Sequence, residues 1–438
     1  MAAHSRLTFG ASRFAHAICQ NLDLSIELPH HLLGRITTVG PRAMTRCAAP
    51  NRLAGTRSGC VGERTKLRFE RVDTLSTLQG LESEWQALFD RRQHAHVVSS
   101  YPFVFASAST RFAQKPWRVY LARNGQSLEA AAFGVRTLIR LGRFTVPAIR
   151  MGTEFLADAI DGPSGDGQLL CALVETIFDE EDVPIVDFGR LTGPAFAALR
   201  PSLTSRKLRS TWNHEGYGHI SDATLDRDEM YAQLSHDRRG NIRRKSRRLC
   251  EAFKIRFEKF SGRDTSENLA WLNQFVDLEA SGWKGREKTA IRCRPAYHEY
   301  LRSLVEIGAR MGMMRWYRLM ADDQVIAMEL GLHAGHAFWP PKTAYDERFA
   351  NYSPGVELVH RLYLDCIDDP DIRCINWISA APAQDAWRPD RLRYYHLRVF
   401  GRSARGRALY AAGALQDGLR RHIFDRNMDA KDRERRFL

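Results

Sequence analysis

The stretch KTAYDERFANYSPGVELVH, residues 342–360, changes character at its midpoint. Before Ser353 it is polar and aromatic without a helical period, and after Pro354 its apolar residues recur at helical spacing. Ser353 suits the N-cap position, because its hydroxyl can accept a backbone N–H of the first turn. Pro354 suits the first helical position, and Gly355 leaves no side chain over the helix start. The stretch therefore predicts a strand end, a loop and a helix from Pro354 to about Asp368.

The predicted helix places Val359, Leu362, Tyr363 and Cys366 on one face, which predicts packing against a sheet. A helix start that follows a strand offers free N–H groups to a phosphate. The same sequence also suits a capped helix that binds no ligand, so the helix start alone leaves both interpretations open.

Three strand-like runs lie before this helix and predict an antiparallel meander. Two helices precede the meander, within residues 271–283 and 296–312, and a strand follows the helix at 373–379. The three runs are MRWYRLM (314–320), VIAMELGL (325–332) and AFWPPKTAY (337–345), joined by short turns at 322–323 and 334–335.

The first half of the chain shows the same order of elements. It predicts a strand at 67–72, a helix at 77–92, three strands within 117–152, a helix near 167–179 and a strand at 184–191. The same order at similar spacing predicts two α/β units, at residues 66–225 and 226–405. Residues 1–62 are predicted to be a disordered extension, or to follow a start codon assigned too early, with Met44 as the alternative. Residues 406–438 are predicted to be a charged tail.

The net charge of +14 favours anionic partners, such as nucleic acid, a phosphate-bearing cofactor or a membrane surface. The arginine-rich usage of a GC-rich genome would give the same excess. No run reaches the roughly 18 apolar residues of a membrane span, and no signal peptide is evident, which predicts a cytoplasmic protein. The eight cysteines are scattered without zinc-ligand spacing, so we expect neither a disulfide framework nor a metal site.

The segments FVDLEASGWKGREKTA (275–290) and KTAYDERFANYSPGVEL (342–358), with the meander between them, resemble the GNAT acetyltransferases of the BioF/CelD-like group. This group is related to the FemAB peptidyltransferases. The basic segment LSHDRRGNIRRKSRRL (234–249) is similar to the Arg-rich helix of the same group. The resemblance covers roughly residues 66–400 and is strongest over 275–360. The segment ISAAPAQDAW (378–387) keeps only a trace of the Gly-Asp-x-x-Tyr-Lys-like pattern common in the group.

The resemblance implies an α/β (α+β) protein of two tandem GNAT-like domains, each a mixed, mainly antiparallel sheet flanked by helices. It also implies an acyl-CoA donor, acetyl-CoA being the usual one, whose pyrophosphate binds at the start of the helix after the meander. This assigns Ser353, Pro354 and Gly355 to the cofactor, with Lys342 as a neighbouring cation. Some members are linked to cellulose or other polysaccharide synthesis, which implies a role in polysaccharide or cell-envelope biosynthesis.

The corresponding loop of the first half, residues 154–167, carries four carboxylates that would repel a pyrophosphate. If one half alone binds CoA, the prediction is therefore the second half. Two of these acids, Asp158 and Asp161, are candidates for taking a proton from an attacking acceptor or for binding it. Such acid-rich glycine loops also occur as ordinary solvated turns.

Two residues of the meander are catalytic candidates. Tyr345 ends the third strand, where a tyrosine in many GNAT enzymes protonates the departing thiolate; an ordinary aromatic strand end is the alternative. Glu329 lies among apolar neighbours, so burial would raise its pKa and suit it to act as a base. A paired, structural glutamate is the alternative for Glu329.

Glu279, Trp283 and Lys284 lie in EASGWKG, where the helix is expected to break at Ser281-Gly282. A tryptophan in a loop either anchors the loop to the core or stacks on a ligand, and the second interpretation makes this loop a lid or an acceptor site.

The basic run RRGNIRRKSRR (238–248) fits a solvated helix, a contact with CoA phosphate, or a site for tRNA or an anionic glycan. Because no aromatic residues alternate with the cations, the run lacks the stacking surface typical of proteins that bind single-stranded nucleic acid.

These residues predict an acyl-CoA-dependent N- or O-acyltransferase that transfers the acyl group directly to an amine or hydroxyl acceptor. Nucleophile-elbow, Walker A, dinucleotide-binding and zinc-protease motifs are absent from the sequence, which argues against those enzyme classes. One alternative is FemAB-like transfer from aminoacyl-tRNA. Another is a non-catalytic protein on a GNAT scaffold that binds nucleic acid or assists glycan assembly.

Overall fold

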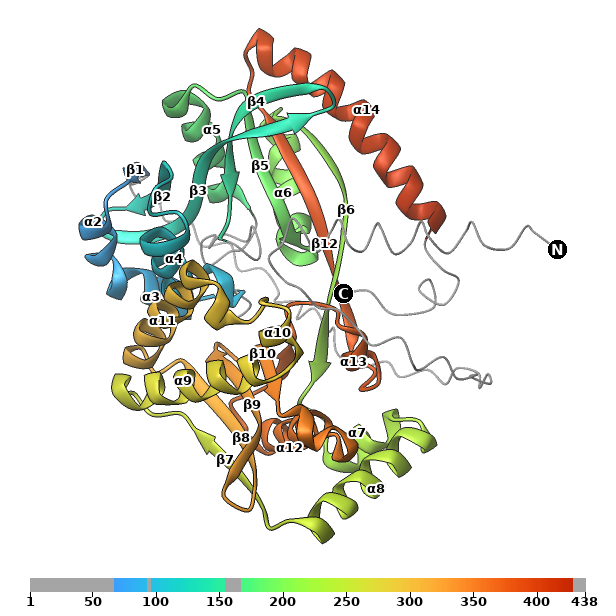
Figure 1. The fold of residues 1–438 in the computed structure, drawn as a ribbon. Helices are drawn as coiled ribbons and strands as arrows, with labels where there is room; N and C mark the ends of the chain where they lie inside the picture. Colours follow the sequence, from blue (N-terminus) through green and yellow to red (C-terminus); the bar gives the residue numbers. More distant parts are fainter. Residues whose placement is uncertain (1–66, 93–95, 154–166, 428–438) are drawn as a thin grey trace, which may run out of the picture. The chain divides into compact units, whose positions relative to one another are not determined.

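A computed structural model describes residues 67–92, 96–153 and 167–427. Its strands form one mixed, mainly antiparallel sheet with helices on both faces (Figure 1), which confirms the predicted fold class. The predicted extension at 1–62 lies outside the described residues. The strands are β1 (Arg68–Val72), β2 (Trp117–Asn124), β3 (Ser127–Leu141), β4 (Phe144–Met151), β5 (Ile185–Thr192), β6 (Arg209–Asp222), β7 (Ile255–Phe260), β8 (Met314–Ala321), β9 (Gln324–Ala334), β10 (Ala337–Tyr345), β11 (Cys374–Asn376) and β12 (Asp390–Phe400).

The helices connect and cover these strands. They are α2 (Leu75–Gln79), α3 (Glu82–Asp90), α4 (Tyr101–Ala106), α5 (Gln168–Glu181), α6 (Gly193–Ser205), α7 (Arg227–Gln233), α8 (His236–Ala252), α9 (Thr265–Ser281), α10 (Trp283–Arg286), α11 (Pro295–Arg310), α12 (Pro354–Asp368), α13 (Pro382–Asp385) and α14 (Ala404–Asn427). Short helical turns span Val97–Ser99, Ser107–Arg111, Ile291–Cys293 and Glu347–Tyr352.

The sheet contains the repeated order of elements that the sequence predicted. The strands follow the order β1-β2-β3-β4-β5-β12-β6-β11-β10-β9-β8-β7. β1 to β4 form an antiparallel meander with β5 parallel to β4, and β7 to β10 do the same with β11 parallel to β10. The two sets of strands therefore lie on either side of the central pair of β12 and β6.

The halves exchange their last strands across this centre. β6 closes the first half of the sequence but pairs with β11 of the second, whereas β12 pairs with β5 of the first half. β6 and β12 are long and pair with each other over most of their length, and Figure 1 shows them running between the two halves. Residues 66–438 accordingly form one compact unit, and the boundary near residue 225 remains a prediction about sequence organisation.

Helices from both halves share a hydrophobic core on one face of the sheet. Phe103 of α4 and Tyr300 of α11 are fully buried in this core, and α4 packs against α11. On the other face of the second half, α12 buries Leu358 and Leu362 against Tyr317 and Phe338. Apolar burial on both faces holds the strands that carry the candidate site.

Most predicted elements are present, and three differ. The helix predicted at 77–92 is two helices, α2 and α3, because the first ends at Gly80. The strand predicted at 373–379 is reduced to β11, Cys374–Asn376. Most of the stretch predicted to be a charged tail is α14, which is held by its buried Asp417: this carboxylate accepts hydrogen bonds from Arg398, Thr211 and Asn213 at 2.5–3.0 Å.

Candidate active site

The candidate site is built around a bulge in β10. Trp339 pairs with Leu332 of β9 and Lys342 pairs with Leu330, so three residues of β10 advance against two of β9. The extra residue comes with Pro340 and Pro341, neither of which has an N–H to donate. β10 pairs with β11 only at Ala337 and Phe338, after which the two parallel strands separate.

The bulge decides which way Lys342 points, and it corrects one prediction. Strict alternation would place Lys342 on the face that α12 covers, opposite to Trp339. The extra residue turns Lys342 to the face of α9 and α11 instead, where its ammonium lies 4.0 Å from Oε1 of Glu279 and 5.1 Å from the centre of the Tyr297 ring. Lys342 is therefore not the cation beside the start of α12.

α12 begins at Pro354 as predicted, but Ser353 does not cap it with its side chain. Ser353 has left-handed backbone angles of φ 55° and ψ 57°, and its hydroxyl makes no hydrogen bond to the first turn. The carbonyl of Ser353 accepts the N–H groups of Val356 and Glu357 instead, at 3.0 and 3.2 Å. Pro354 has no N–H, and no described residue accepts the N–H of Gly355. One backbone donor is thus free at the start of α12.

The hydroxyl of Ser353 is bound by the basic helix α8. Nζ of Lys245 lies 2.5 Å from Oγ of Ser353, and the neighbouring Ser246 donates to Oε1 of Glu357 at 3.1 Å. Burial lowers the pKa of Lys245, and arginines of α8 lower it further. Because a helix start is itself partly positive, this cluster of cations favours an anion at the same place.

On the opposite face of β10, the buried Glu279, predicted to bind the acceptor, contacts Lys284, predicted to do the same, and Lys342, predicted to bind the cofactor. Oε1 of Glu279 accepts from Nζ of Lys284 at 2.7 Å, and Oε2 accepts from the N–H of Ile291 at 2.8 Å. Burial raises the pKa of Glu279, but the two lysines, Lys284 and Lys342, outweigh it and hold the pKa below its ordinary value. Three predicted site residues from distant segments thus meet around one carboxylate.

A second glutamate, Glu347, connects the two segments at residues 275–290 and 342–358. Oε1 of Glu347 accepts from the N–H of Trp283, and Oε2 accepts from Arg286, both at 2.7 Å. A Cβ on Gly282 would lie 3.1 Å from Oε1 of Glu347, so the contact is close. The Trp283 ring is half-buried, belongs to none of the hydrophobic clusters of the described chain, and lies 6.0 Å from the Lys284 ammonium.

A comparison with protein-family models matches residues 236–383 to the acetyltransferase (GNAT) domain, and this range contains every contact of the site described so far. Residues 236–383 match a GNAT acetyltransferase domain, and this range is called the GNAT domain. The resemblance to GNAT acetyltransferases inferred from the sequence is thereby confirmed over these residues. No curated protein matches the chain.

FemX has a fold similar to that of this chain. FemX matches with a TM-score of 0.50 at 9% identity, covering 74% of this chain and 96% of FemX. A conserved protein of unknown function from Bacteroides thetaiotaomicron matches at 0.49 and 12%, covering 76% of this chain and all of that one. A tandem GNAT protein from the clavulanic acid biosynthesis pathway matches at 0.41 and 12%, covering 77% and 100%. At these identities the likeness concerns the fold.

Within the GNAT domain, Tyr345 lies beside the start of α12. Its side chain is 43% exposed, and a Cβ on Gly355 would lie 3.5 Å from Cδ1 of its ring. Tyr345 follows Thr343 on the face that α12 covers. Its ring thus lies near Gly355, and its role as an acid stays a prediction.

Glu329 lies on the same face of the GNAT domain and is fully enclosed. One carboxylate oxygen accepts from Oγ1 of Thr343 at 2.6 Å, and the other has no hydrogen-bond partner. Burial raises the pKa of Glu329 to about 8, so the carboxyl is mainly protonated at neutral pH. The predicted rise of its pKa is present, but no solvent or ligand reaches the carboxyl directly.

His96, in the first half of the chain, contacts Trp339 of the GNAT domain. Nothing in the sequence indicated this contact. The His96 ring lies 4.3 Å from the ring of Trp339 and is 5% exposed. Nδ1 accepts from the N–H of Val98 at 3.3 Å, which puts the proton on Nε2, where it has no partner. Burial lowers the pKa of His96 to about 3, so the ring is neutral.

The first-half candidates Asp158 and Asp161 lie outside the described residues. Within residues 67–92, 96–153 and 167–427, no group of three or more His, Cys, Asp or Glu side chains is placed to hold a metal ion. No helix of the same ranges is long and apolar enough to cross a membrane.

Proposed function

We propose that the protein transfers an acyl group from acyl-CoA, with acetyl-CoA as the expected donor, to an amine or hydroxyl of an acceptor. The observation that carries this proposal is the contact of Lys245 with Ser353 beside the free N–H of Gly355. A helix start with a free N–H and a neighbouring ammonium suits a pyrophosphate. In this proposal Lys245 takes the role that was predicted for Lys342.

The proposed mechanism assigns the donor and the acceptor to opposite faces of β10. The donor lies on the α12 side, where Tyr345 is placed to protonate the departing thiolate. The acceptor lies near Glu279, Trp283 and Lys284, and attacks the thioester carbonyl directly. Because Pro340 and Pro341 carry no N–H, other donors of β10 polarise that carbonyl.

The proton of the acceptor needs a separate base. Glu329 is enclosed and hydrogen-bonded to Thr343, so we assign it to the support of the site. Asp158 stays the proposed proton acceptor, and Asp161 a proposed ligand of the acceptor; both lie outside the described residues. The predicted cytoplasmic location and the role in polysaccharide biosynthesis also stay predictions.

Calorimetric titration of the full chain with acetyl-CoA and CoA tests the donor site. We expect binding to the wild type and its loss in Gly355→Asp, because a carboxylate there repels the pyrophosphate. Gly418→Asp is the matched control, since it also adds an aspartate to a helix, at a position with open space around it. Equal binding by wild type and Gly355→Asp would place the donor elsewhere.

Transfer from aminoacyl-tRNA is the second candidate function. Its support is the exposed arginine face of α8, formed by Arg243, Arg244, Arg247 and Arg248, which offers phosphate contacts beyond the single site at Lys245. FemX, whose fold is similar, is consistent with the same candidate. Thermal unfolding with tRNA and with acetyl-CoA in parallel separates the two: stabilisation by tRNA and none by any CoA species would favour this second function.

A further inference from the structure

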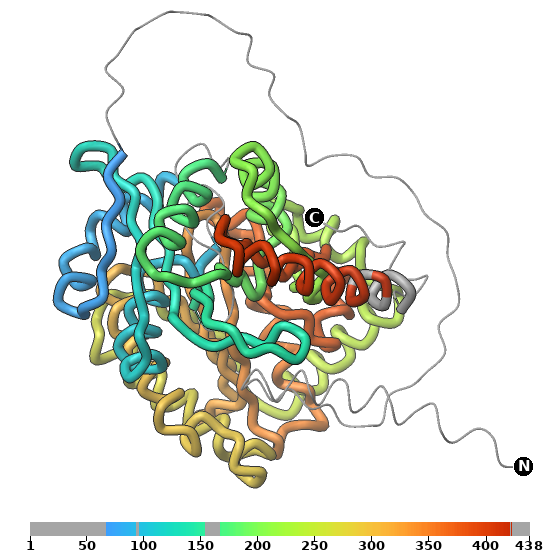
Figure 2. The backbone as a smooth tube through the Cα atoms, turned by 90° about the horizontal axis from the view of Figure 1, so that it is seen from above, coloured from blue at the N-terminus to red at the C-terminus, as the bar shows by residue number. Residues whose placement is uncertain are grey.

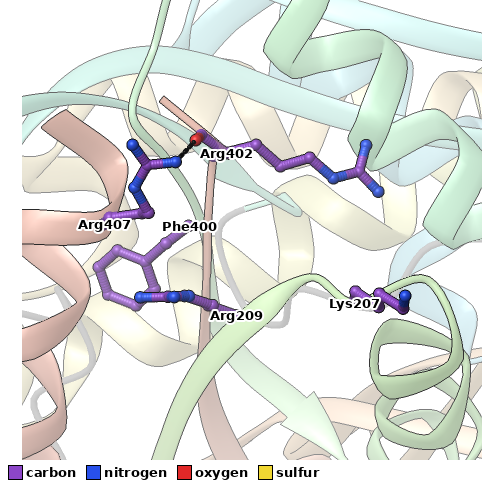
Figure 3. A pocket seen from close by; sticks show the side chains of 6 residues that line it. Lys207, Arg209, Phe400, Arg402 and Arg407 are labelled. Carbon is purple, nitrogen blue, oxygen red and sulfur yellow. Dashed lines mark hydrogen bonds between the residues drawn. The ribbon is translucent and has the colours of Figure 1, made fainter. Parts of the chain in front are cut away.

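A basic cavity lies far from β10, where β12 passes into α14. Its volume is about 280 Å³, and it is lined by Lys207, Arg209, Phe400, Gly401, Arg402 and Arg407. Figure 3 shows Arg209 and Arg407 beside the Phe400 ring, with Arg402 and Lys207 across from them. Four of the six lining residues are cations, and none is acidic.

Two of these arginines are held in position by neighbours. Arg402 donates to Oε1 of Glu175 at 2.7 Å and to the carbonyl of Arg206 at 2.8 Å, and Arg407 donates to the carbonyl of Arg402 at 3.1 Å. No described residue forms an ion pair with Lys207, Arg209 or Arg407. Unpaired cations around one cavity repel each other, and an anion with two or more charges relieves that repulsion.

Apolar residues recur on the outer side of α14 from Ala404 to Leu419. Leu415 is 69% exposed and Leu419 is 57% exposed, and they continue a stripe of small exposed residues at helical spacing. The opposite side of the helix is fixed to the sheet through buried Gly413 and Asp417, so this outer stripe is not available to the core. The small residues of the stripe are Ala404, Ala408 and Ala411.

The tip of the β3–β4 hairpin extends this surface. The N–H of Gly142 donates to Oε1 of Gln416 at 3.0 Å, which holds the tip against α14, and Figure 2 shows the two side by side. Phe144 at the tip is 49% exposed, with the guanidinium of Arg143 5.4 Å from its ring centre. Residues 130–150 contain four arginines and no acid.

We propose that this face docks onto an anionic lipid surface, with Phe144, Leu415 and Leu419 entering the interface and the basic cavity holding a phosphate headgroup. Exposed apolar side chains bordered by arginines suit such an interface, whereas a free phosphate would leave the apolar stripe without a role. The contact is peripheral. It places the acceptor of the reaction near a membrane, independently of which donor the GNAT domain uses.

Sedimentation of the full chain with vesicles tests this proposal. Vesicles of phosphatidylcholine alone are compared with vesicles that also contain phosphatidylglycerol, at low and at high salt. We expect at least about fivefold more protein on the anionic vesicles, and a decrease with salt, because ions screen the attraction between the cations of this face and the anionic headgroups.

Two variants with matched controls locate the contact. Leu415→Ser/Leu419→Ser is expected to lower vesicle binding at least about fivefold, and Leu75→Ser, which changes an exposed leucine of α2, is expected to leave it unchanged. Arg407→Glu is expected to weaken binding to the anionic vesicles, and Lys115→Glu, an equal change of charge on another surface, to weaken it less. Thermal unfolding checks that each variant is folded, and acetyl-CoA titration is expected to be the same for all four.

Three results would overturn the proposal. One is equal binding to neutral and anionic vesicles, or binding to neither. A second is calorimetric binding of inorganic phosphate that Arg407→Glu abolishes while no vesicle binds, which would identify a site for a soluble anion. The third is a dimer that Leu415→Ser/Leu419→Ser converts to a monomer in light scattering, which would make the stripe a contact between two copies.

Discussion

Lys245 donates to the hydroxyl of Ser353 across 2.5 Å, and so joins the basic helix α8 to the start of α12. Residues 108 positions apart in sequence thereby form one polar contact beside the free N–H of Gly355. The basic run and the helix start, which the sequence presented as separate features, are parts of the same candidate donor site.

Lys245→Ala tests this connection. Removing the ammonium is expected to raise the Kd for acetyl-CoA by about tenfold, as expected for one charge-assisted hydrogen bond of roughly 1.5 kcal/mol. Calorimetry measures the change. Arg247→Ala is the control, since Arg247 is exposed and faces Glu251 of its own helix at 3.6 Å. If the control weakens binding as strongly as Lys245→Ala, the effect belongs to the charge of the whole helix.

Tyr345→Phe tests the proposed acid. Once an acceptor is found, the variant is expected to lower kcat by about a hundredfold without changing the Kd for acetyl-CoA, because the hydroxyl acts on the leaving thiolate alone. Release of free CoA thiol measures the rate. Tyr352→Phe serves as the control, because that ring packs at 5.3 Å from Phe253. An unchanged kcat in Tyr345→Phe would remove Tyr345 from the mechanism.

Glu279→Gln tests the buried carboxylate as a support of the acceptor side. The loss of its charge is expected to destabilise the protein by about 1–3 kcal/mol at pH 7, since the two lysines lose their counter-charge and an NH2 group replaces one of the two accepting oxygens. The pKa of Glu279 is lowered in the folded state, so its contribution is present above its ordinary value of 4.5 and is lost as the pH falls through the folded pKa. In urea unfolding from pH 7 to 3, the free energies of unfolding of the wild type and Glu279→Gln should converge. A difference that stays constant with pH would contradict this account.

Glu329→Gln tests the enclosed glutamate, whose pKa is raised, whereas that of Glu279 is lowered. The pKa of Glu329 is raised from 4.5 to about 8, so the wild type should lose stability as the pH rises from about 4.5 to 8, when the unfolded chain releases this proton and the folded one keeps it. The variant should not lose stability in this pH range. At pH 8 it should therefore be more stable than the wild type by about 1 kcal/mol or more.

The exposed Glu299→Gln is the control for this pH dependence. The catalytic rate of Glu329→Gln is expected to match the wild type. A folded Glu329→Gln variant with a strongly reduced catalytic rate would show that Glu329 takes part in proton transfer.

The sequence predicted the strands and helices of the GNAT domain well, because their apolar period changes sharply at places such as Pro354. Glu279, Lys284 and Lys342 were candidate site residues, and the fold brings the three side chains together. The sequence could not predict the direction of Lys342, because that depends on one extra residue in β10. It could not predict the conformation of Ser353 or the ring contact of His96 with Trp339, because both rest on contacts between segments far apart in the chain.

The exchange of β6 and β12 has a consequence for how the chain folds as it is synthesised. β5, Ile185–Thr192, needs β12, Asp390–Phe400, as its neighbour, and about two hundred residues are made between them. Pairing over so long a separation is slow, and until β12 arrives β5 presents an open edge. The first half of the chain therefore leaves the ribosome first but completes its sheet last. Aggregation during synthesis should be greatest while the edge of β5 is unpaired.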